Sequence, residues 1–142
     1  MEKELQKNLE KQGVYFTHLV KELIEILVKS KNPVSTDGIL KKFKKRKFHP
    51  YKSSVYRQLR RLSDLNIVEE SIFSDGIKRY CFIYGEKHHH HFECEKCGKV
   101  SAVPMNSCEK IIDKMTNQLK KSGAKIMSHT LTLEGLCPKC NN

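Results

Sequence analysis

The chain has 142 residues, of which 38% are hydrophobic, and it carries a formal net charge of +11. This length suits one ordinary domain or two small ones with modest cores. The sequence has no apolar stretch long enough to span a membrane and opens on a charged amphipathic segment, so we expect a soluble, cytoplasmic protein with no membrane partner.

The positive charge is concentrated in the first half of the chain. Residues 1–84 contain 18 Lys and Arg against 10 Asp and Glu, a net charge of +8, whereas the remaining residues carry +3. From Lys41 to Arg61 there are ten basic residues and no acidic residue. Solvated charge runs usually mix both signs, so this stretch favours a polyanionic partner, and nucleic acid is the natural candidate.

Apolar periodicity predicts three helices in this half. Thr17 is expected to cap the first helix, which ends before Asn32-Pro33. Ser35 is expected to cap the second helix, and Ser53 or Ser54 opens the third, whose apolar stripe faces the core. The residues at its start and on its exposed side that we expect to contact DNA are Lys52, Ser54, Tyr56, Arg57, Arg60 and Arg61.

A β-hairpin is predicted next. Two alternating segments, Ile67 to Phe73 and Ile77 to Ile83, are joined by Ser74-Asp75-Gly76, in which Asp-Gly is a hairpin signal. Three helices followed by a hairpin form a winged helix-turn-helix. In this fold Arg57 is suited to a guanine edge or a phosphate, and Tyr56 to a thymine methyl group or a phosphate. Partial burial in a structural role is the alternative for Tyr56.

The second half follows a different pattern and predicts a small α/β domain. We place the boundary at Tyr84 to Lys87, which gives a winged-helix domain over residues 1–84 and a second domain over residues 85–142. Strands are expected over Lys99 to Val103 and Lys125 to Leu133. Between them a helix is expected to open at Ser107, end at Gly123 and turn four apolar residues inward, namely Ile111, Ile112, Met115 and Leu119. The fold class is therefore α/β in the α+β sense.

Two cysteine pairs predict a metal centre in this domain. Cys94 and Cys97 are separated by two residues, and so are Cys137 and Cys140. Two such pairs complete a closed tetrahedral thiolate site, the arrangement that zinc takes in structural roles. The zinc is expected to tie the two ends of the domain together and to supplement its core.

Two other interpretations of the cysteines remain open. The pairs form disulfides in an oxidising compartment. Alternatively, His91-Phe92-Glu93 followed by the second pair partly matches the zinc deaminase pattern of H-x-E and P-C-x-x-C. The deaminase interpretation leaves Cys94 and Cys97 without a role, so we expect no enzyme.

Four consecutive histidines, His88 to His91, precede the first cysteine pair. Alternate residues of a strand point to opposite faces. His88 and His90 are therefore expected to serve one metal, and His89 and His91 another. The alternative for any one of them is a solvated surface histidine.

In chain order, these motifs resemble the ferric-uptake-regulator (Fur) family of metal-sensing repressors. The resemblance rests on five segments: Ser54 to Leu59, His88 to His91, Cys94 to Val100, His129-Thr130-Leu131 and Cys137 to Cys140. It implies a homodimer held together by the second domain. It also implies a metal between the domains that draws two winged helices towards a palindromic, AT-rich double-stranded DNA operator.

The resemblance also assigns metal ligands. It makes Cys94, Cys97, Cys137 and Cys140 the structural zinc ligands. It places His89 and His91 in the sensory site, and it implies an additional metal site in the dimerisation domain formed by His88, His90, Glu109 and His129.

Departures from the family pattern favour zinc as the sensed metal. Pro33 stands where iron and peroxide sensors place a histidine, and Cys81 replaces the usual carboxylate on the wing strand. Zinc-sensing members pair such a cysteine with an acidic residue of the preceding strand, here Glu69 or Glu70. A thiolate, two imidazoles and a carboxylate suit zinc better than ferrous iron. A buried structural role is the alternative for Cys81.

We therefore expect a zinc-responsive repressor of zinc-uptake genes, most similar to the zinc-uptake-regulator branch of the family. The first alternative is a ferrous-iron-responsive repressor, with Fe2+ in place of Zn2+ at the regulatory site. The second is a zinc-stabilised nucleic-acid-binding module without sensing. Tyr15 stands where many members place a basic residue for the minor groove, so that contact is not expected here.

Overall fold

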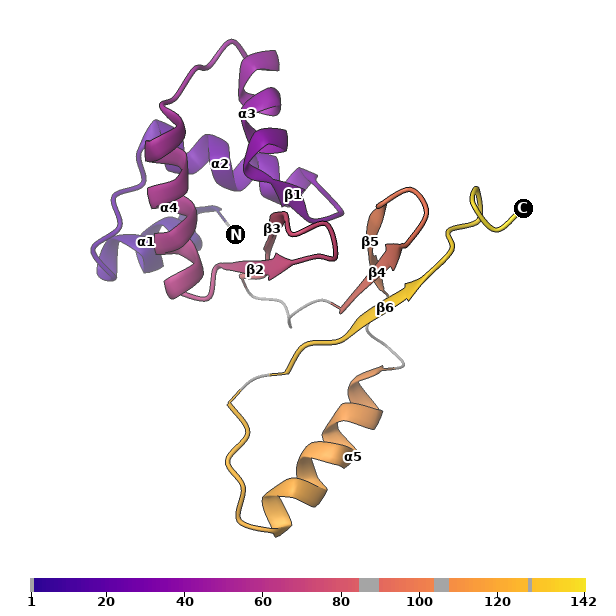
Figure 1. The fold of residues 1–142 in the computed structure, drawn as a ribbon. Helices are drawn as coiled ribbons and strands as arrows, with labels where there is room; N and C mark the ends of the chain where they lie inside the picture. The colour runs from indigo at the N-terminus through magenta and orange to yellow at the C-terminus, as the bar shows by residue number, and fades with distance from the viewer. Residues whose placement is uncertain (1, 85–89, 104–107, 128) are drawn as a thin grey trace. The chain divides into compact units, whose positions relative to one another are not determined.

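The computed structural model describes residues 2–84, 90–103, 108–127 and 129–142. The chain divides into two compact units, Met1–His88 and His89–Asn142, which are described separately (Figure 1). In the described ranges, no helix combines the length and the apolar character needed to cross a bilayer.

The first unit contains helices α1 (Glu2–Lys11), α2 (His18–Lys29), α3 (Thr36–Lys45) and α4 (Lys52–Asp64). The predicted caps of α2 and α3 are confirmed, because Thr17 Oγ1 accepts the N–H of Val20 at 3.4 Å and Ser35 Oγ accepts that of Gly38 at 3.1 Å. Such side chains satisfy backbone donors that the first helical turn leaves open.

Two details of the helices differ from the prediction. The third predicted helix, α4, begins at Lys52 rather than at Ser53 or Ser54, because Tyr51 is already extended and its carbonyl accepts the N–H groups of Ser54 and Val55. The amphipathic opening segment is a full helix, α1, which buries Leu5 and Leu9 in the core. Burial of this i, i+4 pair explains why α1 belongs to the unit.

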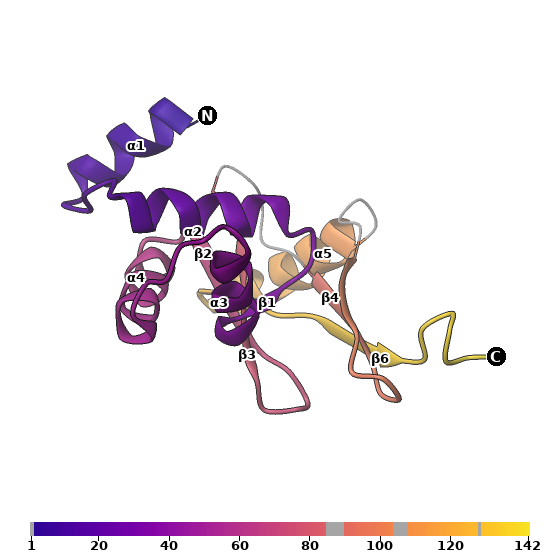
Figure 2. The same ribbon diagram turned by 90° about the horizontal axis from the view of Figure 1, so that it is seen from above.

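A three-stranded antiparallel sheet completes the first unit. The predicted hairpin is confirmed as β2 (Val68–Ile72) and β3 (Lys78–Phe82), and its turn is closed by Gly76 at φ +72° and by Asp75 Oδ1, which accepts the N–H of Ile77 at 2.9 Å. A two-residue strand, β1 (Val34–Ser35), adds to the outer side of β3 and was not predicted. The core lies between the helices and this sheet (Figure 2). The first unit is a winged helix.

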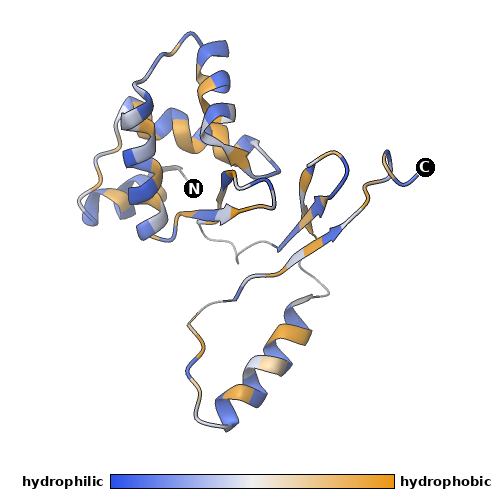
Figure 3. Cartoon of the chain, in the orientation of Figure 1, coloured by the Kyte–Doolittle hydropathy of each residue, from blue (hydrophilic) through white to orange (hydrophobic). Residues whose placement is uncertain are grey.

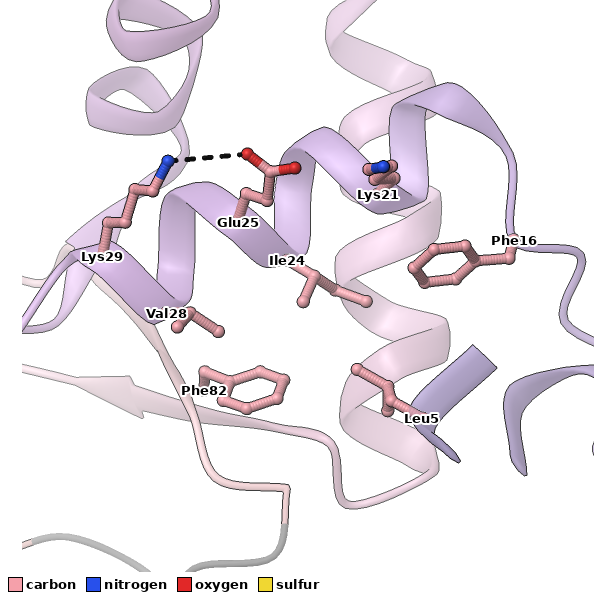
Figure 4. Close-up of a pocket in the computed structure, with 8 residues that line it drawn as sticks. All are labelled: Leu5, Phe16, Lys21, Ile24, Glu25, Val28, Lys29 and Phe82. Carbon is pink, nitrogen blue, oxygen red and sulfur yellow. Dashed lines mark ion pairs between the residues drawn. The ribbon is translucent and has the colours of Figure 1, made fainter. Parts of the chain in front are cut away.

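An apolar pocket lies beside α2 in this unit. Leu5 of α1, Ile24 and Val28 of α2 and Phe82 of β3 converge on it, and the ion pair of Lys29 with Glu25, at 3.6 Å, lies at its edge (Figure 4). Its volume is about 130 Å³. We regard it as part of the packing of α1 and β3 against α2.

The second unit is built on a mixed sheet. Its central strand is β4 (His90–Cys94), which pairs antiparallel with β5 (Val100–Val103) and parallel with β6 (Thr132–Gly135), and helix α5 (Cys108–Lys121) connects β5 to β6. The predicted helix end is confirmed by Gly123 at φ +89°. The α+β class is as predicted, and so is the strand–helix–strand order of β5, α5 and β6.

The predicted last strand, Lys125 to Leu133, is wrong in its bounds. The strand as described, β6, begins at Thr132, which pairs with His91. The Leu131 carbonyl still accepts the N–H of His91 at 3.3 Å, and residues 85–89, which precede β4, lie outside the described residues.

The inward orientation predicted for the apolar residues of α5 is also wrong in the single chain. The exposed fractions are 63% for Ile111, 59% for Met115 and 50% for Leu119, and Ile112 is half-buried. Figure 3 shows hydrophobic segments along α5. The periodicity correctly identifies an apolar helix face, but this chain alone does not cover it.

Candidate metal centre and nucleic-acid interface

The four cysteine sulfurs of the second unit converge. The ligand atoms of Cys94, Cys97, Cys137 and Cys140 all lie within 4.8 Å of one another, and the sulfurs of Cys97 and Cys137 are 3.8 Å apart. A zinc–sulfur distance of about 2.3 Å places tetrahedral ligands about 3.8 Å apart. The donor set therefore fits a closed, four-coordinate zinc site.

The sheet brings the two cysteine pairs to one edge. β4 and β6 are parallel neighbours in which Cys94 pairs with Gly135, so the loops that follow them start side by side. After β4 the N–H of Gly98, at φ +67°, donates to the Cys94 carbonyl at 2.8 Å. After β6 the N–H of Cys140 donates to the Cys137 carbonyl at 2.8 Å. Each pair thus forms a tight turn that directs both of its sulfurs to the same point.

The cluster is electrostatically asymmetric without a cation. The Cys137 N–H donates to Cys94 Sγ at 3.3 Å, and this bond, followed by the Cys97 N–H, lowers the pKa of Cys94 to about 6. The neighbouring sulfurs, that of Cys137 first, raise the pKa of Cys140 to about 12. Thiolates at this spacing repel each other, and a divalent cation removes this obstacle because it favours deprotonation of all its ligands.

This geometry bears on the deaminase interpretation of the cysteines. All four sulfurs belong to a single cluster, which is a closed site, whereas a catalytic zinc site keeps a position open for water or substrate. Cys94 and Cys97 are members of that cluster, so the partial deaminase pattern does not describe it.

The histidine run enters β4, where two of its members are described. His90 is fully buried and His91 is 4% exposed, and as adjacent strand residues they point to opposite faces. The ring centroids of His90 and His129 lie 5.5 Å apart, so the structure brings together two of the four residues predicted for the additional site. A third, Glu109, lies in the first turn of α5. His88 and His89 fall outside the described residues.

One buried acid of this strand was missed by the sequence reasoning. Glu93 is 3% exposed and shares the strand face of His91 by alternation. Its register partner on β6 is Glu134. The same two-residue alternation that separated the histidines would have identified it.

Glu69 and Cys81 are directly opposite each other in the hairpin. The register pairs Glu69 with Cys81 and Glu70 with Tyr80. Burial, and then the Glu69 carboxylate, raise the pKa of Cys81 to about 12. Glu70 lies on the other face, where it forms an ion pair with Lys78 at 2.6 Å. Of the two predicted acids, the structure thus places Glu69 beside Cys81.

The surroundings of Cys81 distinguish it from the core residues of the hairpin. Val68 and Tyr80 belong to the buried hydrophobic cluster, and Phe82 packs against it. Cys81 alternates with Tyr80 and Phe82, so it lies on the opposite face of β3. It is 8% exposed and faces a carboxylate rather than the cluster.

The predicted DNA-contacting residues fall into two groups. On α4, Arg57 and Arg60 are exposed, Tyr56 is 45% exposed and Ser54 is half-buried. The other group already binds protein: Arg61 donates to the Gly13 carbonyl, and Lys52 pairs with Asp37 at 3.0 Å.

One further cation of the basic stretch is also engaged. Arg46 pairs with Glu22 at 2.7 Å and with Glu25 at 3.3 Å, and its hydrogen bond lowers the pKa of Glu22. These pairs join the end of α3 to α2, so part of the predicted basic surface stabilises the winged helix instead.

The first unit is a winged helix with exposed arginines on α4, and the second unit carries a candidate thiolate metal centre. Together they define a metal-binding, DNA-binding protein. The sequence profile of the ferric uptake regulator family matches residues 11–134. The chain belongs to this family. It is therefore a metal-responsive transcriptional regulator rather than an enzyme, and the regulators of this family bind DNA as dimers.

Individual relatives and solved structures agree with this assignment. The chain is 32% identical over 126 residues to the ferric uptake regulation protein of Bacillus subtilis (strain 168), covering 87% of this chain and 72% of that protein. It is 26% identical over 139 residues to the peroxide operon regulator of the same organism, covering 98% and 92%.

Solved structures share the fold. The Helicobacter pylori ferric uptake regulator superimposes with a TM-score of 0.78 at 25% identity, covering 99% of this chain and 91% of that one. A zinc uptake regulator complexed with zinc and DNA superimposes with a TM-score of 0.66 at 21% identity, covering 97% and 91%.

Loss of one cysteine of the cluster should remove the structural metal. We expect Cys94→Ser or Cys137→Ser to release tightly held zinc and to lower the melting temperature, because binding of a structural zinc is part of the folding free energy. Metal analysis after gel filtration and thermal unfolding measure both effects. The matched control is Cys81→Ser, which should retain this zinc. A zinc-free Cys94→Ser protein with unchanged thermal stability would contradict the assignment.

Replacement of an exposed arginine on α4 should weaken DNA binding. We expect Arg57→Ala to cost about 1–3 kcal/mol of operator-binding free energy if it makes a bidentate base contact. The affinity of the parent should fall steeply with salt, with a log–log slope set by the number of neutralised phosphates. Fluorescence anisotropy over a salt series measures both. A flat salt response, or full affinity in the variant, would be incompatible with α4 as the reading helix.

Proposed function

We propose that this protein is a zinc-responsive repressor that controls zinc-uptake genes. The observation that carries the proposal is the cross-strand pair of Glu69 with Cys81. Together with His89 and His91, this pair supplies a thiolate, a carboxylate and two imidazoles. The soft thiolate is the ligand that favours zinc over ferrous iron, whereas imidazole ligands suit both metals.

Three sets of ligands follow from this proposal. The four cysteines hold a structural zinc, and Glu69, Cys81, His89 and His91 hold the regulatory zinc. The additional site consists of His88, His90, Glu109 and His129. The 5.5 Å separation of the His90 and His129 rings supports this last group, and the opposite faces of His90 and His91 support its separation from the regulatory site.

The position of Glu69 and Cys81 gives the regulatory site its effect on DNA binding. Both side chains lie on the hairpin that directly follows α4. Ligand bonds from them therefore restrain the element attached to the recognition helix. A metal that these ligands hold only in the DNA-binding arrangement shifts the population towards that arrangement by its difference in affinity.

The apolar face of α5 supports a homodimer. Ile111, Met115 and Leu119 are four residues apart and exposed, so they form one stripe that a second copy can cover. A two-fold dimer presents two winged helices to two half-sites, so we propose a palindromic operator, which we expect to be AT-rich.

A ferrous-iron-responsive repressor is the second candidate. The 32% identity to a ferric uptake regulation protein favours it. Metal analysis of the purified dimer before and after mild chelation, with operator binding followed in parallel, separates the two. Most sites bind Zn2+ more tightly than Fe2+, so the order of concentrations alone does not decide between them. Binding restored by Zn2+ but not by Fe2+ supplied anaerobically supports the zinc proposal, and full restoration by Fe2+ supports iron.

Removal of a regulatory ligand should separate sensing from folding. We expect His89→Ala, His91→Ala or Cys81→Ser to keep the structural zinc and the dimer but to abolish zinc-dependent operator binding, because one of about four ligands is lost. Operator binding in zinc buffers measures the loss, and His88→Ala should have a milder effect. If Cys81→Ser responds to zinc like the parent while both histidine variants fail, the thiol is not a ligand and the preference for zinc loses its support.

A charge on the apolar face of α5 should dissociate the dimer. We expect Met115→Glu to weaken dimerisation at least about tenfold, since it places a carboxylate where an apolar side chain would be buried. Sedimentation equilibrium measures the dissociation constant. Asn117→Glu adds the same charge to the opposite side of α5 and is the matched control. Equal dissociation constants for the two variants would place the dimer interface elsewhere.

A further inference from the structure

A polar pocket lies between α4 and the β2–β3 hairpin of the winged helix. Its volume is about 350 Å³. The side chains that line it include Tyr56, Arg60 and Asp64 of α4, Glu70 of β2, and Lys78 and Tyr80 of β3. The pocket therefore joins the helix that carries the exposed arginines to the wing, and both of its walls carry a cation.

In the wing, which is the β2–β3 hairpin, the accessible positive charge lies at this pocket rather than at the turn. Lys78 and Arg79 are its basic residues. Arg79 is bound by Asp75 at the turn, through contacts of 2.6 Å and 3.0 Å, and only 16% of its side chain is exposed. Lys78 is 44% exposed and lines the pocket. A polyanion approaching the wing therefore meets Lys78 as its accessible cation.

On the helix side the pocket continues the proposed DNA-binding surface. Tyr56 and Arg60 are one turn apart on α4, and both are exposed. The charge of Arg60 acts on Lys78, since it opposes the raised pKa that the hydrogen bond to Glu70 gives this lysine. Two cations facing one pocket, with a tyrosine hydroxyl beside them, provide the donors that a phosphate group accepts.

The acids of the pocket limit this attraction. Glu70 holds Lys78 in an ion pair of 2.6 Å between side chains that are 33% and 44% exposed. Asp64, at the last residue of α4, also lines the pocket. A phosphate that binds here must therefore compete with Glu70 for Lys78. The Glu70 carboxylate thus lowers the affinity of the wing for DNA.

We propose that this pocket binds one phosphate of the operator backbone, with Lys78 and Arg60 as its ligands and Glu70 as the competing acid. The proposal rests on DNA binding by this family and is independent of which metal is sensed. It adds Lys78 and Glu70 to the interface as residues that set affinity without reading bases.

Two substitutions with opposite expected signs test the proposal. Lys78→Gln should lower operator affinity roughly tenfold, as expected for a lost charged hydrogen bond, and should reduce the salt slope by about one. Glu70→Gln should raise the affinity about two- to fivefold, because it releases Lys78 from its ion pair. Lys110→Gln, on the exposed surface of α5, is the control for a general loss of charge.

A scan of operator duplexes with single neutral methylphosphonate linkages identifies the phosphate itself. All proteins are used as metal-loaded dimers with matched circular dichroism spectra. We expect one backbone position per half-site at which neutralisation weakens the parent but not Lys78→Gln. The proposal would be overturned if neutralisation weakened Lys78→Gln as much as the parent at every backbone position. An unchanged operator affinity in Lys78→Gln would also overturn it. A failure of zinc sensing would leave the scan intact, because it changes the metal that is loaded and not the phosphate contact.

Discussion

The parallel pairing of β4 with β6 is the constraint on which the second unit depends. It sets the ends of two strands that are distant in sequence side by side, and the cysteine turns that follow them meet at one point. Among the described residues of this unit, the buried apolar side chains are Cys94, Val100 and Cys137, so two of the three belong to the cysteine cluster. So small a core needs a second source of stability, which a structural zinc provides.

The same strand connects structure to sensing. β4 ends at Cys94 of the cysteine cluster and begins with His90 and His91. A fixed cluster therefore also fixes the strand that carries His90, proposed for the additional site, and His91, proposed for the sensory site. In the first unit, Glu69 and Cys81 lie on the β2–β3 hairpin that follows α4. In the proposed mechanism, metal occupancy and DNA affinity are coupled because each changes the population of the same arrangement.

Local chemistry made part of this fold predictable. Thr17, Ser35, Asp75-Gly76 and Gly123 each satisfy a cap or turn within a few residues, and each was confirmed. Features that depend on distant partners were not predictable in this way. A two-residue β1 has no period to detect, and the extent of β6 depends on its pairing with the distant strand β4.

The site shows the same division. The spacing of the cysteines identified the cluster, because two residues between sulfurs are enough to form a turn. The sequence named Glu69 with Glu70 as the alternative, and only the strand register shows that Glu69 is the acid opposite Cys81. Likewise, the partners of Arg61 and Lys52 are 48 and 15 residues away, so the sequence could not show that these two cations already interact within the protein.

The central claim is that the four cysteines alone hold the first zinc. X-ray absorption at the zinc edge tests this claim most directly. Spectra are collected with one and then two equivalents of zinc per chain. The account predicts that the first equivalent has four sulfur ligands at about 2.3 Å, and that the second adds nitrogen and oxygen ligands at about 2.0–2.2 Å with a single sulfur. A first equivalent bound by a mixture of sulfur and nitrogen would contradict it.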